Sequence, residues 1–205
     1  ALCTANLPEP AIGPNSAKQA DDYFNSVLYT GNGASSNAIT GIGHKPDFLW
    51  IKNRDAAVSH VLQDSVRGIG SNGVNFNTLI SDTTGAEFNQ ADADGVSSFD
   101  ADGFTVGYTN SAAWNQNTTT YVGWSWKAGG TAVSNTDGST TSSVSAAPDA
   151  GFSILTYTAD SATGTVGHGL NSAPQLIIGR PRSDTNWFVM ETTTLNANDV
   201  LNLDS

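Results

Sequence analysis

Closely spaced aspartates are the first residues in this sequence whose type and spacing suggest chemistry. Two Asp-Ala-Asp-Gly runs bring Asp92, Asp94, Asp100 and Asp102 within a short segment. Calcium takes about six to eight oxygen ligands, which clustered carboxylates supply. The EF-hand pattern fails, because its twelfth position counted from Asp92 is Gly103 rather than Glu. Two Asp-Gly hairpin turns explain the same residues, so a structural calcium site and plain turns both stay open.

Histidine and glutamate are too scattered here to indicate a catalytic centre. His44, His60 and His168 have no second His or Cys at ligand spacing, so structural roles are expected. Only three Glu residues occur, and no spacing singles out an Asp pair for a hydrolase. The sequence has no Gly-x-Ser-x-Gly elbow and no phosphate loop. We therefore predict that the chain is not an enzyme and, apart from the calcium considered above, binds no cofactor.

A tryptophan in a polar stretch is the best candidate for sugar binding. Trp114 is followed closely by Asn115 and Asn117. An exposed indole can stack on a sugar ring while neighbouring amides bind hydroxyl groups. These three residues are the predicted ligand-binding residues, with a sugar as the ligand. The alternative is a Trp114 tucked beneath its own loop.

The composition excludes several classes of protein. Ser, Thr, Asn and Gly make up 85 of the 205 residues, and Lys and Arg only 8, which argues against a helical bundle. A net charge of −11 opposes a nucleic-acid partner. Apolar runs such as residues 48–51 are too short to span a bilayer, so no membrane insertion is expected. The single cysteine, Cys3, excludes an intrachain disulfide.

Alternating apolar and polar residues predict antiparallel strands. Residues 121–127 alternate, with Val122, Trp124 and Trp126 on one face, and residues 104–108 alternate in the same way. Further strands are expected over residues 24–29 and 152–157. Residues 48–51 and 176–178 are apolar on both faces, which is typical of central strands covered on both sides. Trp50, Trp124 and Trp126 are expected in the core.

Turn signals separate these strands. Asp-Gly pairs end at Gly95, Gly103 and Gly138, and a Gly-Asn-Gly turn spans residues 31–33. The best short helical segment covers residues 56–66. Many short strands joined by such turns predict an all-β fold, an antiparallel β-sandwich or jelly roll.

An internal repeat divides the chain. Residues of the first half recur 128 positions later, including an apolar run at 48–50 that matches 176–178. The matched pairs are Phe24 and Phe152, Tyr29 and Tyr157, Gly41 and Gly169, Pro46 and Pro174, Arg54 and Arg182, and Val61 and Val189. We expect an extended linker at residues 1–20, a first β-sandwich domain with its linker at 21–148, and part of a homologous second domain at 149–205. Residues 129–150 are expected to connect the copies. The second copy is expected to be incomplete.

An ordered series of motifs resembles a known family. The motifs include residues 22–33, 39–43, 45–54 and 98–107, and the segment from Tyr121 to Gly130. Together they resemble a repeated β domain of tailed-phage virion proteins, common in marine and cyanobacterial phages and often C-terminal to a SPRY-like sandwich. His44 departs from the pattern, which has a large apolar residue there.

The resemblance implies a structural or adhesive role on a virion surface, such as a tail fibre that attaches to the host or helps to assemble the particle. It implies a homo-oligomer, a trimer by analogy with other fibres, with other virion proteins and a host glycan as further partners. It transfers no catalytic residue. The alternatives are a secreted carbohydrate-binding module without catalysis and a glycan depolymerase.

Overall fold

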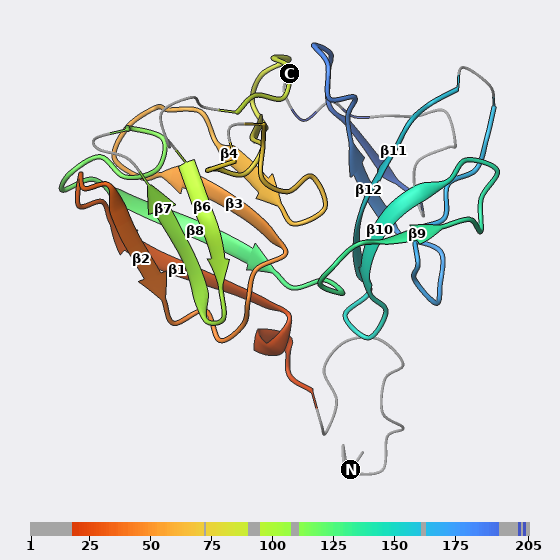
Figure 1. Cartoon of the computed structure of the whole chain (residues 1–205), viewed down its shortest axis with the longest axis horizontal. Coiled ribbons are helices and arrows are strands. Elements are labelled where there is room, and N and C mark those ends of the chain that lie inside the picture. The colour runs from red at the N-terminus through yellow and green to blue at the C-terminus, as the bar shows by residue number, and fades with distance from the viewer. Residues whose placement is uncertain are drawn as a thin grey trace, which may run out of the picture.

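The computed structural model describes residues 18–71, 73–89, 95–107, 111–160 and 163–192, together with Leu201 and Leu203 (Figure 1). Its elements are η2 (Ala20–Asp22), a short 3-10 helix, and the strands β1 (Phe24–Thr30), β2 (Ser36–Thr40), β3 (Phe48–Asn53), β4 (Val61–Asp64), β5 (Leu79–Ile80), β6 (Gly95–Asp100), β7 (Gly103–Gly107), β8 (Thr120–Trp126), β9 (Val133–Asn135), β10 (Ser142–Ala147), β11 (Phe152–Tyr157), β12 (Leu176–Gly179) and β13 (Phe188–Glu191). All pairings between these strands are antiparallel. The all-β antiparallel prediction is confirmed.

The largest sheet has five strands in the order β1-β8-β3-β4-β5. Strand β8 lies between β1 and β3, where Trp124 pairs with Ser26 on β1 and with Trp50 on β3. The predicted strands at 24–29, 48–51 and 121–127 are all present in this sheet. Successive side chains of β8 therefore point to opposite faces of this sheet.

A second sheet, β2-β7-β6, covers one face of the five-stranded sheet (Figure 1). Toward it β8 turns Tyr121, Gly123 and Ser125, which are buried, whereas its tryptophans are only half-buried. The core between the two sheets is made by Ile39, Ile42, Leu49, Ile51, Val61, Val96, Phe99, Phe104, Val106, Trp114 and Tyr121. The two layers form the predicted sandwich, which we call the first unit (β1–β8).

A tight hairpin joins β6 to β7 at the predicted Asp-Gly turn. Phe99 pairs with Phe104 across it, and Asp100 pairs with Gly103. A Cβ atom on Gly103 would lie 1.9 Å from the carbonyl oxygen of Ile39 on β2. Glycine is required here because the neighbouring backbone fills the space of a side chain.

The second unit (β9–β13) repeats part of the first. The 128-residue offset carries β1 onto β11, β3 onto β12 and β4 onto β13. These strands form a three-stranded sheet, β11-β10-β9, and a two-stranded sheet, β12-β13. Residues 129–150 were expected only to connect the copies, yet they contain β9 and β10, and β10 pairs with β11 along its length.

The second unit packs on the face of the five-stranded sheet that β2, β7 and β6 leave uncovered. Trp126 of β8 stacks on Phe152 of β11 with ring centroids 6.2 Å apart. Trp187 is 5% exposed and packs with Leu62 and Leu79, against Trp50 and other partly buried side chains. The tryptophan face of β8 is thus an inter-unit layer rather than part of the main core.

Two expectations about secondary structure were wrong. Residues 56–66 form no helix, and β4 occupies their second half. Residues 176–178 do form β12, but it is not covered on both sides, since Leu176, Ile177 and Ile178 are 56%, 37% and 46% exposed. A continuous apolar run indicates that a strand can be covered, and it does not establish that a covering element is present.

Candidate functional site

The predicted sugar-stacking tryptophan lies inside the first unit. Trp114 is 2% exposed and belongs to the core between the two sheets. Its carbonyl oxygen accepts a hydrogen bond from the Tyr29 hydroxyl at 2.8 Å. The expectation of an exposed Trp114 is therefore corrected, because a sugar cannot stack on a ring that the protein already encloses. The alternative of a Trp tucked beneath its own loop describes the structure.

Asn115 is also buried and has no exposed surface. Its Oδ1 accepts hydrogen bonds from the Asn32 main-chain N–H at 3.1 Å and from Asn37 Nδ2 at 3.0 Å. Its Nδ2 donates to Asn32 Oδ1 at 3.0 Å and to the Ala34 carbonyl at 2.9 Å. The amide is saturated and holds the 31–34 turn, so it has no bond to offer a ligand. Asn117, in contrast, is exposed.

The candidate calcium ligands do not come together in the described structure. Asp102 accepts hydrogen bonds from the main-chain N–H groups of Gly41 at 3.0 Å and Gly43 at 2.6 Å. These bonds lower the pKa of the Asp102 carboxyl below its usual value. Asp100 accepts a bond from the Thr105 hydroxyl at 2.8 Å. Both aspartates serve the hairpin and its neighbouring turn.

The other two candidates, Asp92 and Asp94, lie outside the described residues. Among the residues that are described, no group of three or more His, Cys, Asp or Glu side chains is arranged to hold a metal ion.

His44 and His168 each make local hydrogen bonds through the imidazole ring. His44 is 3% exposed, with Nε2 3.0 Å from the Ser125 hydroxyl and Nδ1 3.3 Å from the Asp21 carbonyl. Burial lowers its pKa from 6.5, although the Asp21 carbonyl opposes the shift. His168 accepts a hydrogen bond from the Leu170 N–H through Nδ1 at 3.1 Å. Burial also lowers the pKa of His60.

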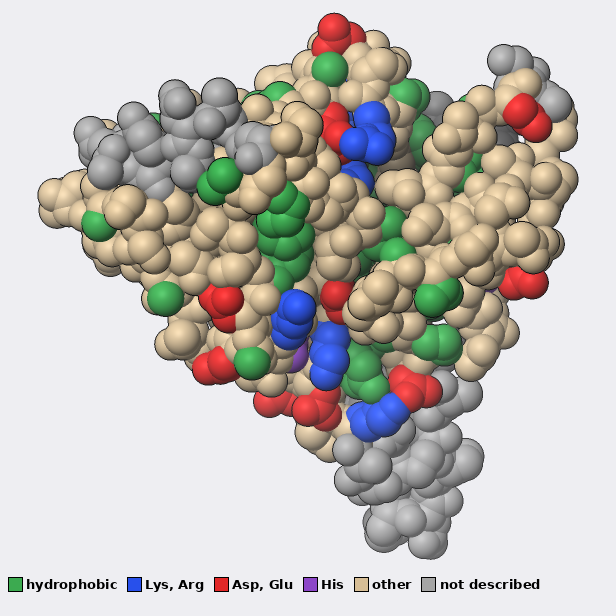
Figure 2. All heavy atoms as spheres, viewed as in Figure 1, with side chains coloured by type: hydrophobic (Ala, Val, Ile, Leu, Met, Phe, Trp, Pro, Cys, Tyr) green, Lys and Arg blue, Asp and Glu red, His purple; other side chains and the backbone are tan. Residues whose placement is uncertain are grey.

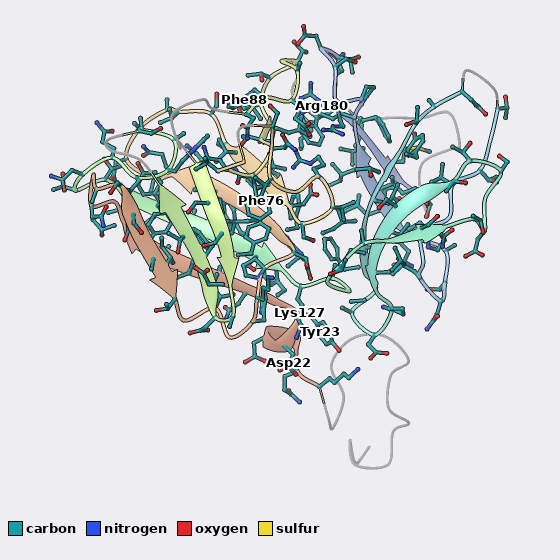
Figure 3. All side chains as sticks on the ribbon, in the orientation of Figure 1. Asp22, Tyr23, Phe76, Phe88, Lys127 and Arg180 are labelled. Carbon is teal, nitrogen blue, oxygen red and sulfur yellow. The ribbon has the colours of Figure 1, made fainter. Side chains whose placement is uncertain are left out.

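The richest polar constellation was not predicted and lies at the junction of the two units, between residues 79–88 and 180–187. Arg180 is its centre (Figure 3). Its guanidinium donates to the carbonyl oxygens of Thr83 at 3.1 Å, Thr84 at 2.8 Å and Gly85 at 2.6 Å. It also lies 5.1 Å from the centroid of the Trp187 ring, within cation–π range. One side chain of the second unit thereby fixes a whole loop of the first.

A buried carboxylate carries the second part of the junction. Glu87 is bound by Arg67 of the first unit at 3.1 Å and by Arg182 of the second, whose Nε donates at 2.8 Å. Arg67 also contacts Asp64 at 2.5 Å. The side chains of Arg67, Asp64 and Glu87 are 6%, 6% and 8% exposed. Charges so deeply buried require partners, so the two units share one ion network.

Main-chain hydrogen bonds complete the junction. The Glu87 N–H donates to the Arg182 carbonyl and the Thr185 N–H to the Thr84 carbonyl, both at 2.9 Å. The Trp187 indole N–H donates to the Ile80 carbonyl at 2.8 Å. The sequence carried one signal for this site, the rarity of charge. In a chain with only 8 Lys and Arg residues, three arginines meet here.

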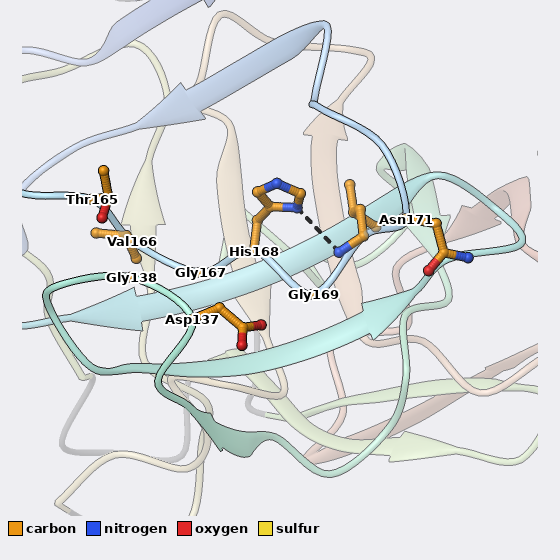
Figure 4. Close-up of a pocket in the computed structure, with 9 residues that line it drawn as sticks. Asp137, Gly138, Thr165, Val166, Gly167, His168, Gly169 and Asn171 are labelled. Atoms are coloured by element: carbon orange, nitrogen blue, oxygen red, sulfur yellow. Dashed lines mark hydrogen bonds between the residues drawn. The ribbon is translucent and has the colours of Figure 1, made fainter.

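A shallow pocket lies on the second unit, where residues 165–171 pass the turn between β9 and β10 (Figure 4). Asp137, Thr165, His168 and Asn171 supply its polar side chains. Asp137 accepts a hydrogen bond from Asn135 Nδ2 at 3.0 Å. Gly169 has a φ of 71°, close to the 89° of its repeat counterpart Gly41.

The surface around these sites is largely uncharged. On the face shown in Figure 2, backbone and uncharged polar side chains cover most of the area, with a few basic side chains beside acidic ones. No helix in the described ranges has the length and apolar character needed to cross a membrane.

Comparison with known proteins places the chain in one family. No curated protein matches it, and no solved structure does. A family model described as a domain of unknown function, DUF7483, matches residues 19–205. That match takes in both units and the junction between them, and the chain therefore belongs to the DUF7483 family.

Proposed function

We propose that the chain is a non-enzymatic structural module of a virion surface, part of a tail fibre or a similar appendage that attaches to the host or holds the particle together. The proposal is supported first by the junction, where hydrogen bonds and a shared carboxylate join the two β units. It is supported also by the ordered motifs that resemble repeated β domains of tailed-phage virion proteins.

The junction suits a load-bearing role because three kinds of contact act together in it. Main-chain hydrogen bonds, the Arg180 guanidinium and the shared Glu87 carboxylate all join the units. Aromatic packing between Trp126 and Phe152 extends the contact along the sheet. Relative motion of units is the usual expectation for small polar interfaces, and a buried ion network opposes it.

The expected partners are further copies of the chain, arranged as a trimer, and other virion proteins. Polar loops rich in Asn, Ser and Thr are the surfaces that would meet a host glycan. Light scattering on the purified chain tests the oligomer, and a monomer at high concentration would contradict the trimer.

The virion role is tested by locating the protein in particles. Mass spectrometry of purified phage should find the chain, and gold-labelled antibody should mark an appendage at the particle surface. Antibody raised against a major capsid protein is the control for accessibility. Detection of the chain in infected cells but not in particles would reject the virion role.

A secreted carbohydrate-binding module is the alternative proposal, and the burial of Trp114 weakens its main support. It depended on Trp114 as an exposed stacking platform, and Trp114 is 2% exposed. A glycan array with a discrete sugar hit on a monomeric chain would favour this alternative.

A further inference from the structure

One residue of the first unit has a strained main chain. Thr118 has a φ of 64° and, among the described residues, is the one non-glycine residue with a positive φ. This left-handed conformation suits glycine or asparagine, and a β-branched residue such as threonine adopts it only at an energetic cost. Residues strained in this way cluster at ligand-binding and other functional sites. The strain at Thr118 therefore points to a role beyond the fold.

Thr118 belongs to a pair of loops at one end of the first unit, residues 31–36 and 115–119, which we call the tip. Figure 1 shows the tip at the end of the molecule that lies away from the second unit. The Thr118 N–H donates to the Gly31 carbonyl at 3.0 Å, and the Gly31 N–H donates to the Thr119 carbonyl at 2.8 Å. These bonds join the two loops, so the tip itself holds Thr118 in its strained conformation.

The two loops of the tip are packed so closely that they have little room to rearrange. A Cβ atom on Gly31 would lie 2.2 Å from the Gln116 carbonyl oxygen, and a Cβ atom on Gly33 would lie 2.9 Å from Asn117 Cβ. Beneath them, the buried Asn115 amide makes the hydrogen bonds to the 31–34 turn described above. The tip thus presents its outer side chains in fixed positions, which lowers the entropic cost of binding a ligand.

The Thr118 side chain contributes little to the fold in return for this strain. It is exposed, and its hydroxyl donates to the carbonyl oxygen of the adjacent Asn117 at 2.6 Å. That bond is local, and it leaves the lone pairs of the hydroxyl oxygen to accept from a ligand. Glycine would adopt the same main-chain conformation without strain. The side chain is therefore of use where the tip meets another molecule.

The chemistry of the tip indicates what that molecule is. Residues 31–36 and 115–119 contain no Asp, Glu, Lys or Arg, in a chain of net charge −11. None of the large apolar side chains that the described structure exposes belongs to the tip. Protein interfaces are anchored by aromatic and arginine side chains, and nucleic acid requires basic ones. Uncharged hydroxyl and amide groups instead match the hydroxyl groups of a neutral sugar.

We propose that the tip binds a neutral glycan through Asn117 and Thr118. The Asn117 amide carries both donors and an acceptor, and the Thr118 hydroxyl oxygen accepts, so adjacent hydroxyl groups of one sugar can bond to both residues. Trp114 takes no part, because it lies in the core beneath the tip. The inference assigns a surface to host attachment, and it rests on that part of the proposed function.

An array of neutral and acidic oligosaccharides tests the site, with the intact chain biotinylated and presented on streptavidin so that weak single contacts add up. Binding should be confined to neutral sugars. NMR titration of the intact chain with the best-bound sugar should then change shifts at residues 31–36 and 115–119. Absence of binding to neutral sugars, binding to acidic sugars alone, or shift changes confined to other parts of the chain would refute the site.

Thr118→Gly separates a binding role from a structural one. The change relieves the strain and removes the hydroxyl, so the midpoint of thermal unfolding should not fall, whereas affinity for the sugar should fall roughly tenfold or more. Asn117→Ala should weaken binding to a similar degree.

Thr136→Gly is the matched control, because Thr136 is an exposed threonine of the second unit, in the loop after β9. This variant should bind the sugar as tightly as the unaltered chain. Unchanged binding in Thr118→Gly, or an equal loss in Thr136→Gly, would overturn the assignment. The site and the virion role fail separately. A chain that is present in phage particles but binds no neutral sugar would reject the tip site alone, and a chain that binds neutral sugars but is missing from particles would reject the virion role alone.

Discussion

At the scale of single residues, Asn115 is the side chain on which the turn at residues 31–34 depends. Replacing it with Ala removes four part-buried hydrogen bonds to Asn32, Ala34 and Asn37 and leaves a gap where the buried amide stood. We expect Asn115→Ala to lower the free energy of unfolding by about 3 kcal/mol in urea denaturation. Asn117→Ala, two positions away and exposed, should change it by no more than about 0.5 kcal/mol.

His44 should make stability depend on pH. Burial lowers its pKa from 6.5, so the unfolded chain binds a proton at a pH where the folded chain does not. Stability is therefore complete above about pH 6.5 and is lost as the pH falls toward the lower folded pKa. Denaturation series from about pH 8 to about pH 5 should show this slope.

His44→Gln should reduce that slope, and His60→Gln should remove a further part, since burial lowers the pKa of His60 as well. Carboxylates such as Asp102, whose pKa is lowered from 3.8, bind protons only at more acidic pH, so they do not contribute to the slope in this pH range. An unchanged slope in the double variant would contradict the assignment.

At the scale of elements, the β6–β7 hairpin depends on the absence of a side chain at Gly103. A Cβ there would lie 1.9 Å from the Ile39 carbonyl oxygen, so β2 would have to move. We expect Gly103→Ala to cost about 3 kcal/mol or more by thermal or urea unfolding. For comparison, a Cβ on Gly85 lies 3.6 Å from its nearest neighbour, and Gly85→Ala should be close to neutral.

The junction should weaken when Arg180 is shortened. Arg180→Ala removes the guanidinium hydrogen bonds to the carbonyl oxygens of residues 83–85, of which only that of Thr84 keeps a second described donor, the Thr185 N–H, and it removes the contact with Trp187. A loss of about 2–4 kcal/mol is expected, together with faster hydrogen exchange at residues 83–87. Lys52, its repeat counterpart, donates one long hydrogen bond to the Ala56 carbonyl at 3.4 Å, so Lys52→Ala should have little effect. Equal losses of stability in Arg180→Ala and Lys52→Ala would argue against the role of Arg180 in holding the two units together.

At the scale of the whole molecule, the sequence predicts the strands and turns better than it predicts what packs against them. Period 2 predicts β8 and its two faces, and an Asp-Gly pair between Phe99 and Phe104 predicts the hairpin, because both signals are local. Which face meets the main core is not local. Phe104 packs where β8 offers Gly123, so the face with Tyr121, Gly123 and Ser125 meets the core and the tryptophan face meets the second unit.

The predicted site failed for the same reason. A polar neighbourhood suggested that Trp114 is exposed, but its polar neighbour Asn115 turns inward to bind a distant turn. The junction brings Glu87 together with Arg182, residues far apart in the sequence with no shared motif. The repeat relates β3 to β12 correctly, yet it cannot show which of the two strands other elements pack against.

The tryptophan face of the five-stranded sheet has a consequence for synthesis of the chain. Its cover includes Trp187, which follows Trp126 by about 60 residues. At about 5–20 residues per second, a ribosome leaves this face bare for roughly 3–12 s after β8 has emerged. For that interval the nascent chain presents an aromatic surface to its surroundings, so we expect the timing of translation, and not only final stability, to influence how much of the protein aggregates.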